Sequence, residues 1–319
     1  MNFFKDWISL TSRSAWPLQS IDNSSQCHTP QSPVDKKTHS KRKVKDANAS
    51  TAKHQREDVQ WLHLQIQHQR RHFQDRIKGK TISSSDITMR MVTILFDWLL
   101  DVKVKFKVSD SAFLDSCHLI RRALSTEFFD DLKRQKLQLF GVACFGIAAK
   151  FHDVYAPEMR DYHYITDRSC TPKEIVLMEK KVLLALDYRV QPITHYMLAK
   201  NLTQVYLPSI SLKQQAMQDY ICFCTAVDAR IGFEFEPFYL ALATIAIANQ
   251  SIGPDSWQEA LQPVQYSKKK LRDTVSAISS LAEDLENRNL KSAKRRFSTA
   301  KKFHVATITW LADERRNKR

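Results

Sequence analysis

Three histidines near the start of the helical region are the residues whose spacing first suggests metal chemistry. His63, His68 and His72 lie in a Gln-rich segment, and His68 and His72 are four residues apart, which would place both imidazoles on one face of a helix. A zinc site needs three or four protein ligands, and the pair His68/His72 alone is a poor one. We therefore expect solvated histidines and no metal site.

Six cysteines are scattered without the spacing of a disulfide framework or a metal site. The nearest pair, Cys222 and Cys224, lies in an apolar run with helical periodicity, where side chains two residues apart point in different directions. Free thiols fit a reducing compartment, so we expect an intracellular protein.

Motifs for catalysis are missing. There is no Gly-rich phosphate loop, no HExxH helix and no Gly-x-Ser-x-Gly turn, and the chain has only five glycines. The acids and histidines of the central region occur singly, as on solvated helix faces. We therefore expect a protein that binds partners rather than an enzyme, and no cofactor.

The net charge of +15 and the pI of about 9.5 first suggest nucleic acid or an acidic partner. Many of the basic residues fall near the ends, between Lys36 and Lys45 and between Lys291 and Arg319. We expect disordered basic tails over residues 1–53 and 287–319. No apolar run reaches 18 residues, so we expect no membrane segment.

One strongly apolar pattern runs from Asp86 to Val102, DITMRMVTILFDWLLDV. Its apolar residues repeat at i, i+3, i+4 and i+7, and further apolar side chains cover the rest of the cylinder, which predicts a helix inside a bundle. The Asp86 carboxylate can accept from free N–H groups of the first turn. We therefore expect the helix to begin near Ile87.

Other helices follow from capping residues and from composition. Ser109 and Asp110 can cap a helix that runs to Leu124, and Thr171 with Glu174 can form a capping box. The alternating segment 103–108 is interpreted as a frayed helix end and a loop. Two apolar segments rich in small residues, Gly and Ala in 135–151 and Ala in 235–249, are typical of central helices that neighbours approach closely. The expected helices are 55–77, 87–102, 110–124, 135–151, 173–186, one opened by Pro192, 212–231, 235–249, a short one after Pro254, and 266–285.

The order of these helices recurs, once over residues 86–187 and once over 192–285. The predicted fold class is all-α, with two tandem five-helix units. We expect an N-terminal helix and linker over residues 54–82, a first unit over 83–190 and a second unit over 191–286.

With all segments in order, the chain resembles the cyclin family, most closely the A/B type, over about residues 57–285. The match to the first cyclin box is specific, because several motifs occur together at near-family spacing. The second box rests mainly on residues 235–248, Trp257 and the helix after Tyr266. The motifs of the first box are the segment 86–102, LQLFGVACFGIAAKF at 137–151, YAPE at 155–158, YITD at 164–167, Thr171 to Glu179 with Leu183, and Pro192 to Thr194.

The resemblance implies a regulatory subunit that binds and activates a cyclin-dependent serine/threonine protein kinase in cell-cycle control. At the kinase-contacting lysine and glutamate of the family this chain has Lys150 and Glu179, and a local salt bridge is the alternative interpretation of the pair. The apolar positions around them match Ile147, Phe151 and Leu183.

The resemblance also implies a patch that receives Arg-x-Leu-type substrates or inhibitors. Asp101 stands where the family has glutamate, and ordinary core packing is the alternative interpretation of the apolar members. The matching residues are Met91, Ile94, Leu95, Trp98, Asp101 and Gln138.

Two positions depart from the family pattern. Val92 stands at the place of an arginine in the first helix, and Arg121 at the place of its aspartate partner in the second. We expect Val92 to pack against the second helix, and Arg121 to carry its guanidinium out to solvent or to a nearby acid. The alternative is a partly degenerate, less stable first box.

A second functional hypothesis is a cyclin-fold scaffold without a kinase partner, which binds nucleic acid or transcription machinery. The presence of both Lys150 and Glu179 favours the kinase over nucleic acid. The basic cluster of Lys36, Lys37 and Lys41 to Lys45 predicts a nuclear protein that is also found in the cytoplasm, and plain solubility is the alternative role of this cluster.

Overall fold

The computed structural model describes residues 57–71, 73, 81–191, 193–253, 257–287 and 291–308. The predicted tail over residues 1–53 lies outside these ranges, and so do Pro192 and Pro254. Every regular element within the described ranges is helical, which confirms the all-α prediction. None of these helices combines the length and apolar character needed to cross a bilayer.

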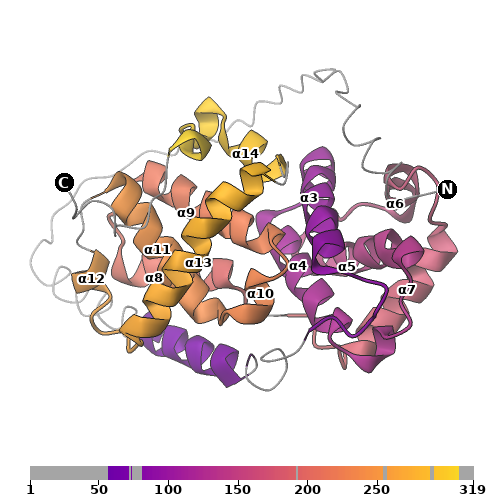
Figure 1. Ribbon diagram of the computed structural model, residues 1–319, viewed down its shortest axis with the longest axis horizontal. Helices are drawn as coiled ribbons and strands as arrows, with labels where there is room; N and C mark the ends of the chain where they lie inside the picture. The colour runs from indigo at the N-terminus through magenta and orange to yellow at the C-terminus, as the bar shows by residue number, and fades with distance from the viewer. Residues whose placement is uncertain are drawn as a thin grey trace, which may run out of the picture. The chain divides into compact units, whose positions relative to one another are not determined.

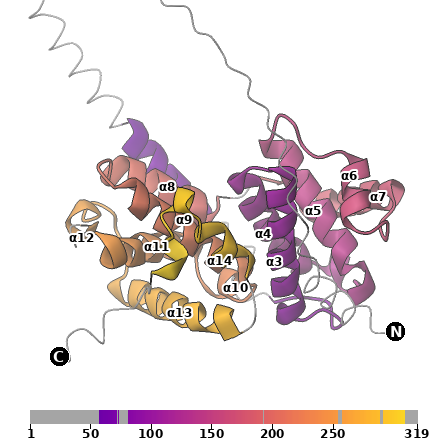
Figure 2. The same cartoon turned by 90° about the horizontal axis from the view of Figure 1, so that it is seen from above.

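Five helices form the first box, with α5 at its centre (Figure 2). Residues 139–149 of α5 are all buried, because α3, α4 and α7 pack around this helix. The helices are α3 (Met89–Phe106), α4 (Asp110–Leu124), α5 (Leu137–His152), α6 (Met159–Ile165) and α7 (Pro172–Ala185).

Small residues in α5 let its neighbours approach, as the composition predicts. A Cβ atom added to Gly141 would lie 2.7 Å from the Leu95 side chain of α3. A Cβ atom added to Gly146 would lie 2.9 Å from Oε1 of Glu179 on α7. These two glycines therefore set how closely α3 and α7 pack on α5.

The second box repeats the arrangement around α11, which confirms the prediction of two tandem five-helix units. Residues 237–249 of α11 are all buried, with α8, α9 and α13 packed against them. A short extra helix, α10, follows α9. The helices are α8 (His195–Tyr206), α9 (Leu212–Val227), α10 (Ile231–Glu234), α11 (Pro237–Ile252), α12 (Trp257–Ala260) and α13 (Lys268–Asn287).

The N-terminal helix, residues 57–71, packs on the second box (indigo in Figure 1). The Asn201 side chain donates to Gln65 Oε1 at 2.8 Å, and the Arg70 guanidinium lies 4.3 Å from the centroid of the Phe238 ring. Leu62 and Ile66 are buried on the inner face of this helix. The helix that precedes the first box in sequence is therefore anchored to the second.

The prediction of one continuous helix over residues 212–231 is wrong. α9 ends at Val227, and Asp228 takes an extended conformation. The Asp228 carboxylate then accepts hydrogen bonds from the backbone N–H groups of Arg230 and Ile231, at 2.9 and 3.1 Å. This side chain offers the backbone an alternative to helical hydrogen bonding, so the chain turns here.

Helix α3 also begins later than predicted, at Met89 and not near Ile87. Thr88 caps α3 by accepting from Met91 N–H at 3.3 Å, while the Asp86 carboxylate accepts from the Arg134 backbone at 2.8 Å and from its guanidinium at 2.7 Å. The Ser109 cap and the Thr171–Glu174 capping box are confirmed. The alternating segment after residue 102 stays helical up to Phe106 and ends at Lys107 in a left-handed conformation.

The prediction of a disordered tail from residue 287 is wrong for residues 291–308. Phe297 and Val305 are fully buried, with Ala293 and Ala306 nearly so, because apolar residues are interleaved with the lysines and arginines. The segment lies beside α3 and α9 (Figure 2). It contains α14 (Ser292–Phe297) and two short 3-10 helices, η3 (Ala300–Lys302) and η4 (Val305–Thr307).

The prediction that Arg121 reaches solvent or an acid is also wrong. The side chain is buried, and its guanidinium donates to the carbonyl oxygens of Ala226 at 2.6 Å, Asp228 at 2.8 Å and Ala229 at 3.3 Å. The carbonyl groups at the end of α9 lack helical partners and carry the negative end of the helix dipole, so a cation is stabilised there. Arg121 therefore joins the two boxes. Val92, the other position that departs from the family pattern, is fully buried.

Candidate functional site

An ion pair between α5 and α7 forms the centre of the predicted kinase-binding site. Lys150, near the end of α5, places Nζ 2.7 Å from both carboxylate oxygens of Glu179. The Lys150 side chain is 48% exposed, whereas that of Glu179 is only 9% exposed. The carboxylate is held in the space above Gly146, where a larger residue would collide with it.

This geometry gives the two members of the pair different roles. The glutamate is fixed by its surroundings, because α5 and the Tyr162 ring enclose the same space. The lysine lies at the surface, where its ammonium group can donate to a partner as well as to Glu179. The pair is a local salt bridge in the free chain, and its exposed side also offers an oriented charge to a partner.

The predicted apolar residues around this pair are exposed to different degrees. Phe151 is 47% exposed and Leu183 is partly exposed, whereas Ile147 is buried and supports the surface from below. Two residues that the sequence analysis did not assign to the site, Val154 and Tyr155, are 91% and 94% exposed in the loop that follows α5. Phe151, Val154 and Tyr155 lie within five residues of one another in sequence, so the end of α5 and the loop after it present apolar side chains to solvent.

A sequence signal for Val154 and Tyr155 does exist. They come directly after the end of a buried helix and before Pro157, so no helical period hides them from solvent. Periodicity analysis finds buried faces, and it therefore gives no information about apolar residues in a loop.

The predicted docking patch lies on α3 and the start of α5. Met91, Ile94, Trp98 and Gln138 are partly exposed, as a binding surface requires. Leu95 is buried against Gly141 and cannot contact a partner, because its position on α3 faces α5. We use the term docking patch for Met91, Ile94, Trp98, Asp101 and Gln138.

The acidic member of the docking patch has a partner within the chain. The Asp101 carboxylate lies 2.7 Å from Nη2 of Arg295, with the two side chains 50% and 66% exposed. Burial raises the pKa of Asp97, one helical turn before Asp101, to about 6, although a hydrogen bond from Ser292 of α14 opposes this rise. Both carboxylates therefore face the C-terminal segment.

His152 adds a titratable pair beside the predicted kinase-binding site. Its Nε2 atom lies 2.6 Å from Oδ2 of Asp115, and this hydrogen bond raises the pKa of the imidazole. The ring also packs edge-on against Phe151, with centroids 5.2 Å apart. The pair fixes the end of α5 from which Phe151 projects.

Within the described ranges, no group of three His, Cys, Asp or Glu side chains could hold a metal ion. His63 and His68 are exposed, and His72 lies outside these ranges. Cys222 and Cys224 are both buried free thiols of α9.

Comparison with known families matches both helical repeats. The family described as the cyclin N-terminal domain matches residues 60–191, and the family described as the cyclin C-terminal domain matches residues 194–310. Together the two matches cover most of the chain. The chain belongs to the cyclin family.

Individual relatives agree with this assignment. The chain is 26% identical to G2/mitotic-specific cyclin-B1 of Oryzias latipes, in a match that covers 74% of this chain. It is 28% identical to G2/mitotic-specific cyclin-B of Hydra vulgaris, in a match that covers 71% of this chain. A G2/mitotic-specific cyclin-A of Hydra viridissima is 32% identical over 62% of this chain and 46% of the relative. The matches span 57% and 62% of the two cyclin-B relatives, which is less than two thirds of their lengths.

A solved structure shares the fold. The viral cyclin from herpesvirus saimiri superposes with a TM-score of 0.58 and 16% sequence identity, over 68% of this chain and 95% of the viral chain. At this identity the likeness shows the arrangement of helices alone.

Proposed function

We propose that this chain is the regulatory subunit of a cyclin-dependent serine/threonine protein kinase and that it acts in cell-cycle control. One observation carries the proposal: the enclosed Glu179 carboxylate and the half-exposed Lys150 ammonium form a fixed pair bordered by exposed apolar side chains. The names of the B- and A-type relatives support a role in the cell cycle. The chain would act by binding, without catalysis of its own.

The chemistry of this surface suits a helical partner. Exposed Phe151, Val154 and Tyr155 can bury apolar area, which supplies most of the affinity of a protein interface. The Lys150–Glu179 pair can fix the register of the partner, because charges near an interface core exclude misplaced alternatives. By the family resemblance, the partner element would be the mobile regulatory helix of the kinase.

A pull-down tests this proposal. The tagged chain, expressed in dividing cells, should retain a cyclin-dependent kinase that mass spectrometry identifies, and the eluate should phosphorylate a general kinase substrate. Recovery of transcription machinery or nucleic acid without any such kinase would contradict it and support the scaffold hypothesis.

We further propose that the docking patch recruits Arg-x-Leu-type substrates or inhibitors. The patch combines partly exposed apolar side chains with one carboxylate, which suits a peptide that carries a leucine and a cation. A fluorescent Arg-x-Leu peptide should bind the folded chain and lose affinity for Trp98→Ala. Equal affinity for both proteins would reject the patch.

The basic C-terminal segment gives little support to nucleic acid as the partner. Arg295, Arg296 and Lys302 all pair with carboxylates of the same chain. Charges that are already neutralised contribute less to phosphate binding.

The basic residues 36–45 lie outside the described ranges, and we propose that they direct the chain to the nucleus. A tagged chain whose distribution is unchanged when Lys41, Arg42 and Lys43 become alanine would contradict this.

A further inference from the structure

The C-terminal segment reaches the docking patch through one residue. Arg295 of α14 holds Nη2 2.7 Å from Oδ1 of Asp101, although the two residues are 194 positions apart in sequence. Asp101 is the acidic member of the docking patch. The cation that would pair with this carboxylate is therefore supplied by the chain itself.

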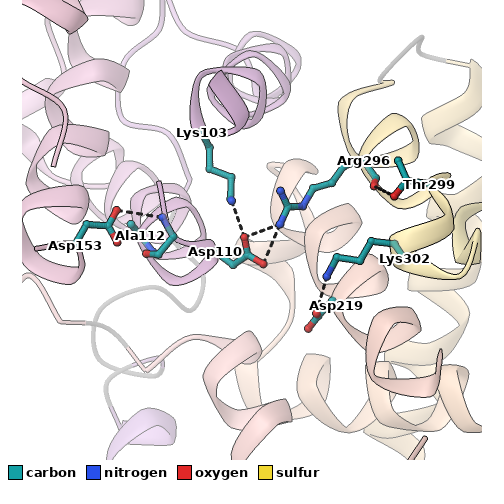
Figure 3. A network of polar contacts seen from close by, with 9 residues as sticks. Lys103, Asp110, Ala112, Asp153, Asp219, Arg296, Thr299 and Lys302 are labelled. Carbon is teal, nitrogen blue, oxygen red and sulfur yellow. Dashed lines mark hydrogen bonds and ion pairs between the residues drawn. The ribbon is translucent and has the colours of Figure 1, made fainter. Parts of the chain in front are cut away.

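A partly buried network fixes the helix that carries Arg295. The neighbouring Arg296 donates two hydrogen bonds to the Asp110 carboxylate, at 2.8 and 3.1 Å, and Lys103 pairs with the same carboxylate at 2.6 Å (Figure 3). The Lys103 side chain is only 6% exposed. Lys302, which follows α14, pairs with Asp219 of α9 at 3.6 Å.

Apolar contacts also fix the same helix. Phe297 is fully buried, and its ring lies 5.4 Å from those of Tyr220 and Phe223 on α9. Burial of an aromatic side chain supplies a large share of local stability. The position of α14 therefore does not depend on the exposed Arg295–Asp101 pair.

Two contacts of Ser292 position the start of α14 and the Arg295 side chain. The backbone N–H of Ser292 donates to Asp97 Oδ1 at 3.2 Å, which ties the start of α14 to α3. The Arg295 guanidinium also lies 3.4 Å from Ser292 Oγ. Arg295 is thus presented to Asp101 by a helix that is already fixed in the fold, so the pair forms without the translational and rotational loss that a cation on a free peptide incurs.

We propose that Arg295 is a specificity-determining residue of the docking patch, because it occupies Asp101 and competes with the arginine of an incoming Arg-x-Leu peptide. This inference rests on the proposed docking function. A ligand must displace Arg295 to gain its own ion pair, so the net gain from the peptide cation is small. The patch consequently selects ligands mainly by their apolar residues at Met91, Ile94 and Trp98.

The test compares two peptides on matched proteins by fluorescence anisotropy. The peptides carry Arg-x-Leu or Ala-x-Leu in otherwise identical sequences, and the proteins are the full chain, Arg295→Ala and Lys301→Ala. Lys301 is an exposed residue of the same segment, so its loss removes an equal charge while the Arg295–Asp101 pair stays in place. Thermal unfolding checks that all proteins are folded.

Arg295→Ala should bind the Arg-x-Leu peptide about two- to five-fold more tightly, which is the range expected for one exposed ion pair. Its affinity for the Ala-x-Leu peptide should not change, and Lys301→Ala should behave like the unaltered chain. In an Asp101→Asn background the gain from Arg295→Ala should disappear, because the carboxylate for which the two cations compete is absent.

Three results would overturn the inference while docking itself stands: unchanged affinity in Arg295→Ala, an equal gain for both peptides, or an equal gain in Lys301→Ala. If neither peptide binds any of the proteins, or if Trp98→Ala binds as well as the unaltered chain, the docking proposal fails and the inference fails with it.

Discussion

The Arg121 side chain of α4 lies so close to Gly232 of α10 that a Cβ atom at position 232 would collide with it. The glycine leaves the space through which the guanidinium reaches the carbonyl oxygens at the end of α9. The guanidinium also lies over the ring of Phe96 on α3, 4.8 Å from its centroid. One buried cation thus contacts three helices and joins the two cyclin boxes.

Replacing Arg121 with leucine should destabilise the chain by about 3 kcal/mol, because the substitution leaves buried carbonyl groups without donors. The measurement is chemical unfolding followed by circular dichroism. Arg90→Leu is the matched control, since Arg90 is exposed on α3. Equal stabilities of the two variants would show that the Arg121 hydrogen bonds contribute nothing net.

Substitutions at Val92 of α3 and Arg121 of α4, made singly and together, test this junction further. Thr93 Oγ1 accepts from Ala229 N–H at 3.1 Å, so α3 reaches the same turn that receives Arg121. Val92→Arg alone should destabilise by burying a second cation, and Arg121→Asp alone by placing a carboxylate among carbonyl oxygens. The double variant should recover much of the loss in melting temperature. A loss equal to the sum of the single losses would show that positions 92 and 121 do not interact.

Local sequence signals predicted the helices, because their causes are local. The Ser109 cap, the Thr171–Glu174 capping box and the small-residue pattern of α5 all act within a few residues. The start of α3 shows the limit of such signals. Asp86 and Thr88 are both suitable caps, and the choice depends on Arg134, which lies 48 residues further along the chain.

The other differences between the predicted and the observed structure arise from contacts between residues that are far apart in the sequence. Arg121 finds its acceptors more than 100 residues away, and Arg296 finds Asp110 at a separation of 186 residues. Helical periodicity and composition give no information about partners so far away. A basic segment that folds onto the domain therefore cannot be distinguished in sequence from a disordered basic tail. In the candidate site, Lys150 and Glu179 were predicted from family motifs, whereas Val154 and Tyr155 were missed because helical periodicity identifies buried faces and not loop residues.

Phe297→Ala tests whether the C-terminal segment is part of the folded domain. Removing this fully buried ring should cost about 3–5 kcal/mol of stability, the usual effect of a large-to-small change in a core. The control is Phe303→Ala, because Phe303 belongs to the same segment and is 43% exposed. A Phe297→Ala protein as stable as the Phe303→Ala protein would contradict the folded segment.

The stability of the chain should fall in mild acid because of His195. Burial lowers the pKa of this imidazole to about 4, whereas an unfolded histidine titrates near 6.5. Between these values the unfolded state binds a proton that the folded state excludes, so stability is fully present above about pH 6.5 and is lost as pH falls toward 4. The loss from this one group should reach about 2 kcal/mol at pH 5.

Two variants separate this effect from the rest of the protein. His195→Gln should lose less stability between pH 7 and pH 5 than the unaltered chain. Asp97→Asn should lose more, because the pKa of Asp97 is raised to about 6 and its protonation favours the folded state as pH falls. Between pH 7 and pH 5 the melting temperature should therefore fall less for His195→Gln, and more for Asp97→Asn, than for the unaltered chain. Variants whose melting temperatures change with pH in parallel with the unaltered chain would refute both assignments.

The most direct test of the account is the affinity of the chain for a cyclin-dependent kinase with and without Glu179. The full chain, Glu179→Ala and Lys180→Ala, which changes the exposed neighbouring residue on α7, would be titrated against a panel of purified kinases, with binding and phosphorylation both recorded. We predict that at least one kinase is bound and activated, that Glu179→Ala weakens this binding by about 1–3 kcal/mol while remaining folded, and that Lys180→Ala does not. Equal binding and activation by Glu179→Ala, or no binding to any kinase, would contradict the account.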